Sequence, residues 1–107
     1  MEKKTCKETV YISGPITGQL DCAKQIFEAA ELGLKKQGFK VLNPFKFNDD
    51  HDKTWEAYMK VCIKQLLKAD KIYMLPYWQR SKGAVIEHQI ASDLGINIHY
   101  ILNVNRI

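Results

Sequence analysis

The stretch Ser81-Lys82-Gly83-Ala84-Val85-Ile86-Glu87-His88 decides how the rest of the chain is interpreted. It follows the apolar run 72–76 and begins a predicted helix that extends to residue 94. On that helix, one face carries Glu87 together with Gly83, Ala84, Ile90, Ala91 and Leu94. A carboxylate on an inward face is costly unless a partner or a solvated cleft compensates for it. Glu87 is therefore either a candidate functional group or a plain helix-start residue at the edge of the core, and the spacing alone leaves both interpretations open.

Size and composition place limits on the type of protein. The chain has 107 residues, which predicts a single domain, 1–107. No apolar run approaches the ~20 residues that a membrane span needs, and the N-terminus lacks a signal-peptide core. We therefore expect no membrane partner and a cytoplasmic location.

The charged and metal-binding residue types show no clustering. The net charge is +4, but the lysines are scattered along predicted helices, which favours solvated helix faces over a nucleic-acid polymer as partner. A phosphate on a small ligand remains compatible with this charge. The cysteines and histidines (Cys6, Cys22, Cys62, His51, His88 and His99) show neither disulfide nor zinc spacing. We expect free thiols, no metal and no cofactor.

Predicted strands and helices alternate along the chain. Strands are predicted at 9–13, 39–42, 71–75 and 96–102, and helices at 21–36, 54–69 and 81–94. Residues 45–53 are predicted as an irregular loop, and Asp70 as an anchor for the start of the third strand. This alternation is typical of an α/β fold. We predict a flavodoxin-like or Rossmann-like parallel sheet of order 2-1-3-4, with helices on both faces.

That strand order places a ligand crevice between the first and third strands, flanked by loops 14–18 and 76–81, with Glu87 just beyond the second loop. Small residues and hydroxyls in the first loop allow a ligand to approach the backbone, namely Ser13, Gly14, Thr17 and Gly18. The loop lacks the dinucleotide and P-loop patterns, and it can equally be a plain turn.

The second loop also has two interpretations. Trp78 can stack on a planar ring, or it can pack against the sheet end or another subunit. Ser81, together with the amides of Gly83 and Ala84, can bind an anion at the helix start, or it can be a plain N-cap.

Four segments of the sequence together resemble a known family. The segments are Tyr11-Ile12-Ser13-Gly14-Pro15-Ile16-Thr17-Gly18, Trp55-x-x-Tyr58-Met59, Ala69-Asp70-x-Ile72-Tyr73-Met74-Leu75-Pro76-x-Trp78 and Ser81-x-Gly83-Ala84-x-x-Glu87. Together they resemble the nucleoside 2-deoxyribosyltransferase-like superfamily, and within it the small DUF4406 proteins.

The resemblance implies N-glycosidic bond cleavage or (deoxy)ribosyl transfer on a nucleoside or nucleoside 5′-monophosphate. Glu87 matches the nucleophile that forms a covalent glycosyl-enzyme, and Tyr11 matches the residue that positions it. This role calls for an ionised Glu87 with a low or normal pKa, helped by the helix dipole. Ser81 in the first motif position favours a nucleotide over a free nucleoside. The predicted substrate-binding residues are Ser13, Gly14, Thr17, Gly18, Trp55, Trp78, Ser81, Gly83 and Ala84.

One position departs from the superfamily pattern. Cys62 lies where an aspartate is expected to handle the proton of the leaving base, and a thiol is a poor acid for that purpose. Two alternatives therefore stay open: a catalytically impaired nucleotide-binding module, and an oligomeric interaction protein whose aromatics serve subunit contacts, namely Trp55, Tyr58, Tyr77 and Trp78. The superfamily also implies a homo-oligomer that completes its site with a neighbouring subunit.

Overall fold

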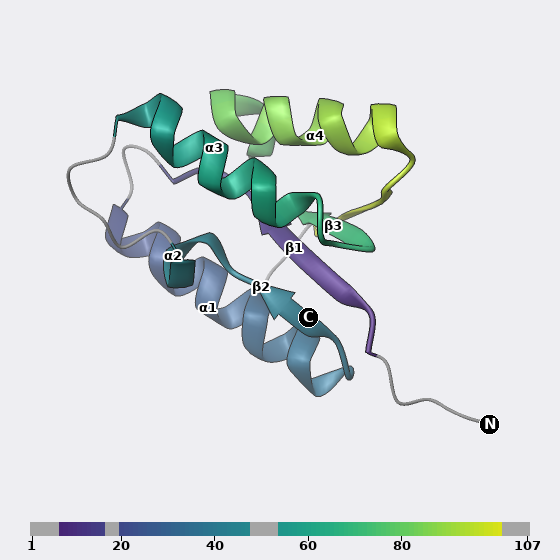
Figure 1. Cartoon of the computed structure of the whole chain (residues 1–107). Helices are drawn as coiled ribbons and strands as arrows, with labels where there is room; N and C mark the ends of the chain where they lie inside the picture. The colour runs from purple at the N-terminus through teal and green to yellow at the C-terminus, as the bar shows by residue number, and fades with distance from the viewer. Residues whose placement is uncertain (1–6, 17–19, 48–53, 102–107) are drawn as a thin grey trace.

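The sheet has the predicted order. The computed structural model describes residues 7–16, 20–47 and 54–101, apart from the side chains of residues 20, 21 and 47. Strands β1 (Thr9–Ser13), β2 (Lys40–Leu42), β3 (Lys71–Met74) and β4 (Asn97–Tyr100) form one sheet in the order β2-β1-β3-β4 (Figure 1). All neighbouring strands are parallel, and Tyr11 of β1 lies opposite Leu42 on one side and Ile72 on the other. The predicted α/β class and strand order are confirmed.

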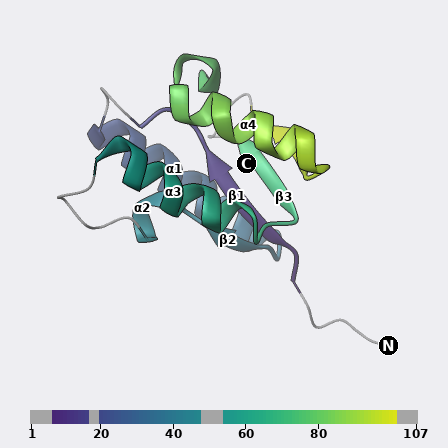
Figure 2. The same ribbon diagram turned by 45° about the horizontal axis from the view of Figure 1, so that its top comes forward.

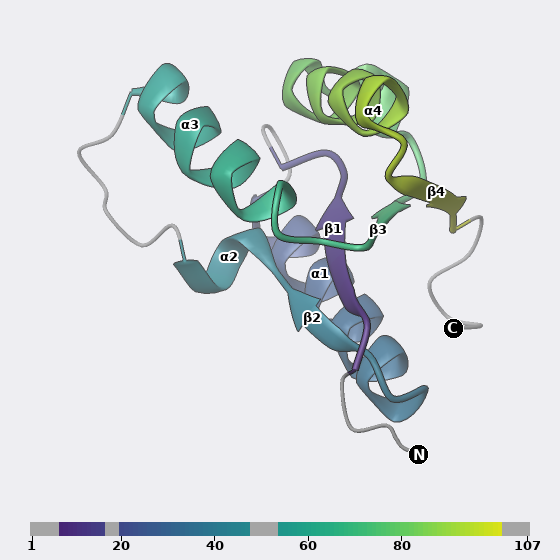
Figure 3. The ribbon, with the colours of Figure 1, turned by 45° about the vertical axis from the view of Figure 1, so that its right-hand side comes forward.

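Helices cover both faces of this sheet, as predicted. Figure 3 shows α3 (Trp55–Leu66) and α4 (Lys82–Leu94) on one side and α1 (Leu20–Lys36) on the other. Strand alternation sends Val10 and Ile12 into the core under α1, where they meet Phe27 and Leu34. Tyr11 points to the opposite face, where its cluster includes Cys62, Leu66, Ala84 and Ala91.

The prediction of an irregular loop at 45–53 was wrong at its start, because the chain forms the short helix α2 (Pro44–Phe47) there. Asn43 explains this turn, because its side-chain oxygen accepts a hydrogen bond from the Phe45 amide at 3.0 Å. Proline suits the first helical position because its fixed φ is already helical. Residues 48–53, including His51, lie outside the described part of the chain, as do Cys6, Thr17 and Gly18.

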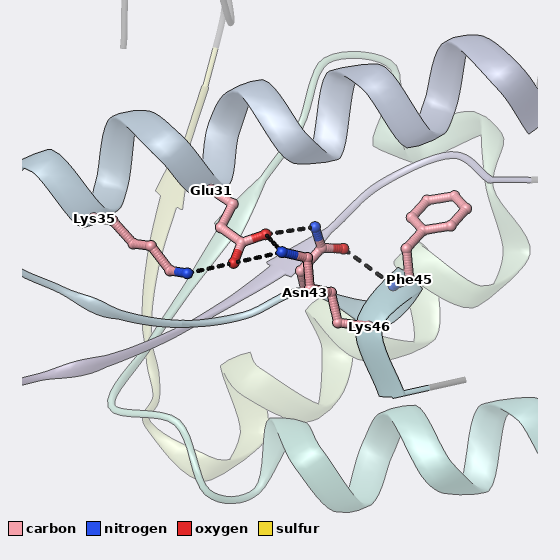
Figure 4. Close-up of polar contacts among 5 residues, drawn as sticks. All are labelled: Glu31, Lys35, Asn43, Phe45 and Lys46. Carbon is pink, nitrogen blue, oxygen red and sulfur yellow. Dashed lines mark hydrogen bonds and ion pairs between the residues drawn. The ribbon is translucent and has the colours of Figure 1, made fainter. Parts of the chain in front are cut away.

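A buried carboxylate ties α2 to α1. Glu31 is 4% exposed and accepts a hydrogen bond from the Asn43 side-chain amide at 3.0 Å. Lys35 and Lys46 approach the same carboxylate at 2.9 Å and 3.2 Å (Figure 4). Burial raises the pKa of Glu31, but the hydrogen bonds from Lys35, Asn43 and Lys46 lower it by more, so the net shift is downward. This cluster fixes α2 beside α1, where Phe45 packs edge-on against Phe27 at 5.2 Å between centroids.

A side-chain contact also fixes the start of β1 next to the start of β3. Asp70 accepts a hydrogen bond from the Thr9 amide at 2.8 Å, so its predicted anchoring role is confirmed. The predicted strands 39–42 and 96–102 are shorter in the structure, as β2 and β4. The described helices include none long and apolar enough to cross a bilayer.

Gly14 allows a close approach at the carboxyl end of the sheet. A Cβ added there would lie 2.8 Å from the Cβ of Leu75, which belongs to the chain just after β3. The first loop can therefore pack tightly against the end of β3 only if residue 14 has no side chain. At Gly83 in α4, the nearest atom to an added Cβ is the Met59 sulfur, also at 2.8 Å, which lies near the end of a flexible side chain.

We expect Gly14→Ala to reduce the free energy of unfolding by about 1–3 kcal/mol, because overpacking must shift rigid atoms. Gly83→Ala is the matched control, and it should cost clearly less, because Met59 can adopt another rotamer and alanine is a better helix former than glycine. Urea unfolding of the two variants measures the difference. An equal or larger loss for Gly83→Ala would contradict this account of the loop.

Candidate functional site

Glu87 lies on the buried face of α4. Ser81 caps the N-terminus of this helix, where its hydroxyl accepts a hydrogen bond from the Ala84 amide at 3.2 Å, and Gly95 caps the C-terminus in a left-handed conformation. Ala84, Glu87 and Ala91 are buried, as the helical spacing predicted. The prediction was wrong for Leu94, which is the last residue of α4 and is 60% exposed.

The carboxylate of Glu87 is held by two hydroxyl groups from one strand. Tyr11 donates a hydrogen bond to Oε2 at 2.7 Å, and Ser13 donates one to Oε1 at 2.6 Å. Residues 11 and 13 are two apart on β1, so both side chains point to the face that α4 covers. Each carboxylate oxygen therefore has its own donor, and the orientation of the group is fixed from both sides.

Burial dominates the acidity of Glu87. The side chain is 5% exposed, and this desolvation raises its pKa from 4.5 to about 7, although the hydrogen bonds from Ser13 and Tyr11 act to lower it. The expected low or normal pKa was therefore wrong. The helix dipole does not offset the burial, because its effect falls off within the first turn and Glu87 lies beyond that turn.

Helix α3 supplies the neighbouring wall. Tyr58 and Cys62 lie close to Glu87 and Tyr11, and Cys62 is 1% exposed. Burial raises the pKa of the Tyr58 phenol well above its ordinary value, and Cys62 and the charge of Glu87 raise it further. The pKa of Tyr11 is raised by burial first and by Glu87 next. Both phenols therefore keep their protons at neutral pH.

These groups line one cleft of about 1340 Å³ between the ends of β1 and β3 and the helices α3 and α4. Pockets for small ligands commonly measure roughly 300–1,000 Å³, so a nucleotide-sized molecule has ample room. Figures 1 and 2 show α3 and α4 beside one another over this part of the sheet. The cleft therefore lies at the switch point that the strand order predicted.

Most of the predicted site residues come together in this cleft. Its lining includes Tyr11, Ser13, Gly14, Trp55, Cys62, Ser81, Gly83, Ala84 and Glu87. The hydroxyl of Ser13, predicted to bind substrate, donates its hydrogen bond to Glu87, and its role toward a substrate stays a prediction. Thr17 and Gly18 lie outside the described residues, so their predicted role stays a prediction.

Trp78 is not brought into the cleft. It belongs to the short 3₁₀ turn η1 (Trp78–Arg80), and its ring stacks on His88 with 4.2 Å between centroids. His88 in turn lies 2.7 Å from the Tyr100 hydroxyl. Of the two interpretations offered by the sequence, packing at the end of the sheet is the one that the structure shows.

Sequence reasoning missed several lining residues, including Tyr58, Met59, Arg80 and Lys82. The signal for the first two was available, because they share a helical face with Trp55 and Cys62 at spacings of three, four and seven. Arg80 and Lys82 could not be found from sequence spacing, because only the folded structure brings them to the cleft. Lys82 extends its ammonium group over the Trp55 ring at 4.2 Å, which brings the start of α4 next to the start of α3.

Positive charge gathers at the mouth of the cleft. Besides Lys82, the guanidinium of Arg80 lies over the Tyr77 ring at 4.9 Å. Tyr77 itself has a left-handed φ of 67°, an uncommon conformation for a bulky residue, just before η1.

Within the described ranges, no cluster of three metal-ligating side chains is present.

Comparisons with known proteins identify the family and the fold of the chain. A family model described as "Domain of unknown function (DUF4406)" matches residues 8–100. None of the curated proteins matches the chain. Among solved structures, it is similar to the 2-deoxyribosyltransferase from the psychrotolerant bacterium Bacillus psychrosaccharolyticus, with 17% identity and a TM-score of 0.68 over 86% of this chain and 70% of that one.

A second similar structure is the 2-desoxiribosyltransferase from Leishmania mexicana, with 22% identity and a TM-score of 0.67. The match covers 88% of this chain but 63% of the Leishmania protein, so the present chain spans less than two thirds of that relative. At these identities, both likenesses show the fold alone.

The raised pKa of Glu87 predicts a pH-dependent stability. Since that pKa is about 7 in the folded chain against an ordinary value of 4.5, the folded state binds this proton more tightly than the unfolded state. The stability from this group is complete below the unfolded pKa and is lost, by about 3 kcal/mol, as the pH rises through the folded pKa.

Glu87→Gln removes this loss, so the variant should gain stability relative to the unsubstituted protein as the pH rises from about 4 to about 8. Urea unfolding at a series of pH values measures the difference. A difference between the two proteins that does not change with pH would show that burial does not control this carboxylate.

Proposed function

The chain belongs to the DUF4406 family, and we propose that it breaks the N-glycosidic bond of a nucleoside or nucleoside 5′-monophosphate, with Glu87 as the nucleophile. One observation carries the proposal. A buried carboxylate, fixed by Tyr11 at 2.7 Å and Ser13 at 2.6 Å, faces a cleft large enough for a nucleotide. The two similar structures are named as 2-deoxyribosyltransferases, which supports deoxyribosyl chemistry as a use of this fold.

The reaction follows from the chemistry of the carboxylate. An oxygen of ionised Glu87 attacks C1′ as the bond from C1′ to the base nitrogen breaks, through an oxocarbenium-like transition state. The product is a glycosyl ester of Glu87, which water or a second base then resolves. Tyr11 and Ser13 act on Glu87 in both steps: they hold it for attack, and they stabilise its returning charge when the ester breaks.

The mouth of the cleft favours a nucleotide over a free nucleoside. Arg80, Ser81 and Lys82 follow one another along the lining, where two cationic groups flank a hydroxyl at the start of α4. A 5′-phosphate placed there would meet positive charge and a helix N-terminus. Hydrolysis and transfer share the first half-reaction, and our proposal covers both.

A specific observation favours a second candidate, a nucleotide-binding module without turnover. The thiol of Cys62 lies buried in the wall next to Tyr11 and Tyr58. A thiol there offers little help in protonating a neutral base as it leaves. The two candidates differ in one result, because the module would be stabilised thermally by nucleotides but would release no base.

Base release from a panel of nucleosides and nucleoside 5′-monophosphates tests the proposed activity. Glu87→Gln should lower the rate by roughly 10³-fold or more, because the nucleophile is lost. Its thermal unfolding midpoint should not fall below that of the unsubstituted protein, since an amide can still bond to both hydroxyls and has no charge to bury. Equal release by the two proteins, or none with any substrate, would refute the assignment.

The pH profile of base release should follow the ionisation of Glu87. The rate should fall as the pH drops through about 7, because the protonated acid is a poor nucleophile. Ser13→Ala removes a hydrogen bond that lowers this pKa, so the fall should move to higher pH. Ser13→Thr keeps the hydroxyl and is the control. An unchanged or lowered midpoint in Ser13→Ala would contradict the role given to this bond.

A further inference from the structure

The protons next to Glu87 belong to weak acids. Tyr11 and Ser13 use their hydroxyl protons to bond to Glu87 itself. The adjoining wall adds the phenol of Tyr58 and the thiol of Cys62. Burial raises the pKa of Tyr58, as it does that of Tyr11, so both phenols hold their protons firmly. Among the described residues that line the cleft, the other carboxylic acid is Glu56, which is exposed in the first turn of α3.

The wall formed by α3 is rich in electrons. It presents the rings of Trp55 and Tyr58 and the sulfur atoms of Met59 and Cys62 to the same cleft that Glu87 faces with its carboxylate. Aromatic faces attract cations. The Trp55 ring already has a cation over it, since the Lys82 ammonium lies 4.2 Å from its centroid. A buried anion and an electron-rich wall together suit a planar ring that carries positive charge.

The charge of the leaving heterocycle decides whether the glycosidic bond from C1′ to nitrogen can break without a general acid. A neutral purine or pyrimidine leaves C1′ as an anion unless a proton reaches it, which is why a positioned general acid accelerates such steps by about 10²–10⁴-fold. A ring whose glycosidic nitrogen or attached ring system is already cationic takes the electron pair of the breaking bond and leaves neutral. It needs no proton from the protein.

We propose that the preferred leaving group at this site is a positively charged, planar nitrogen heterocycle, so that the substrate is a nucleoside or nucleotide of the pyridinium or N-alkylated purine class. This inference rests on the proposed function, since it needs Glu87 as the nucleophile. It goes further by naming the substrate class that the residues around Glu87 can turn over.

The step balances without an external acid. The Glu87 oxygen forms a bond to C1′, and the bond from C1′ to nitrogen breaks with its electron pair moving into the cationic ring, which departs neutral. Water then attacks C1′, the ester bond returns its pair to Glu87 as a carboxylate, and one proton from that water passes to solvent. A cation and water thus give a free sugar, a neutral base and a proton.

A matched pair of substrates isolates the effect of the charge of the base on the rate of cleavage. Guanosine 5′-monophosphate and 7-methylguanosine 5′-monophosphate share sugar, phosphate and ring, and they differ by one methyl group and its positive charge. Nicotinamide mononucleotide and adenosine 5′-monophosphate form a second pair on the same ribose phosphate. For each substrate the rate with Glu87→Gln is subtracted, because cationic rings also leave faster in water. We expect the charged member of each pair to be cleaved about 10²-fold faster.

Cys62→Asp tests the reason for this preference. A carboxylic acid in the α3 wall should supply the proton that a neutral base needs. The ratio of the cleavage rate of the charged member to that of the neutral member should therefore fall by roughly tenfold or more, mainly because the neutral member is cleaved faster. Thermal unfolding checks that the variant folds. If it does not, the two substrate pairs still decide the inference with the unsubstituted protein.

The outcomes separate this inference from the proposed function. Glu87-dependent cleavage of neutral-base nucleotides at rates equal to or above those of their charged partners would overturn the inference and leave the proposed function intact. No Glu87-dependent cleavage of any substrate, charged or neutral, ribose or deoxyribose, would overturn both. A charge preference that persists unchanged in folded Cys62→Asp would show that the thiol position does not set it.

Discussion

The hydrogen bonds from Tyr11 and Ser13 to Glu87 are the contacts on which the rest of the site depends. A carboxylate that is 5% exposed loses most of its hydration, and the energetic cost is large unless donors replace the lost water. Two hydroxyls on alternate positions of one strand meet this need without any cation, so the charge of Glu87 is held but not neutralised. That balance leaves the pKa near 7, where the anion exists at neutral pH yet stays reactive.

The remainder of the fold keeps that geometry in place. Parallel pairing fixes β1 between β2 and β3, so the ends of β1 and β3 open on the same edge, and the N-terminus of α4 follows there. Close approaches at Gly14 and Gly83 bring the first loop and α3 up to the cleft. On the opposite face, the Glu31 cluster fixes α2 against α1 by charge-assisted hydrogen bonds. The two buried glutamates differ in kind: Glu31 is paired with lysines and has a lowered pKa, whereas Glu87 is bonded to hydroxyls and has a raised one.

The sequence predicts the architecture because periodicity and turn residues are local signals. Alternating strand and helix patterns led to the sheet order, and the helical face of Glu87 led to the site. Features that depend on contacts distant in the sequence were missed. The Asn43 cap joins residues only two apart and was a local signal for α2, whereas the Glu31 contacts with Asn43 and Lys46 join residues 12 and 15 apart and were not visible in the sequence. The stacking of Trp78 on His88 and the strong burial of Glu87 also required the packed structure, and the pKa expectation failed because desolvation is a tertiary property.

Capture of the covalent intermediate would test the central claim most directly. The protein is quenched with acid during turnover of a nucleotide, and intact mass with peptide mapping locates any sugar adduct. Our account predicts one sugar phosphate attached through an ester to Glu87, absent from Glu87→Gln. Base release with no adduct, or with the adduct on another residue, would contradict the role of Glu87 as nucleophile.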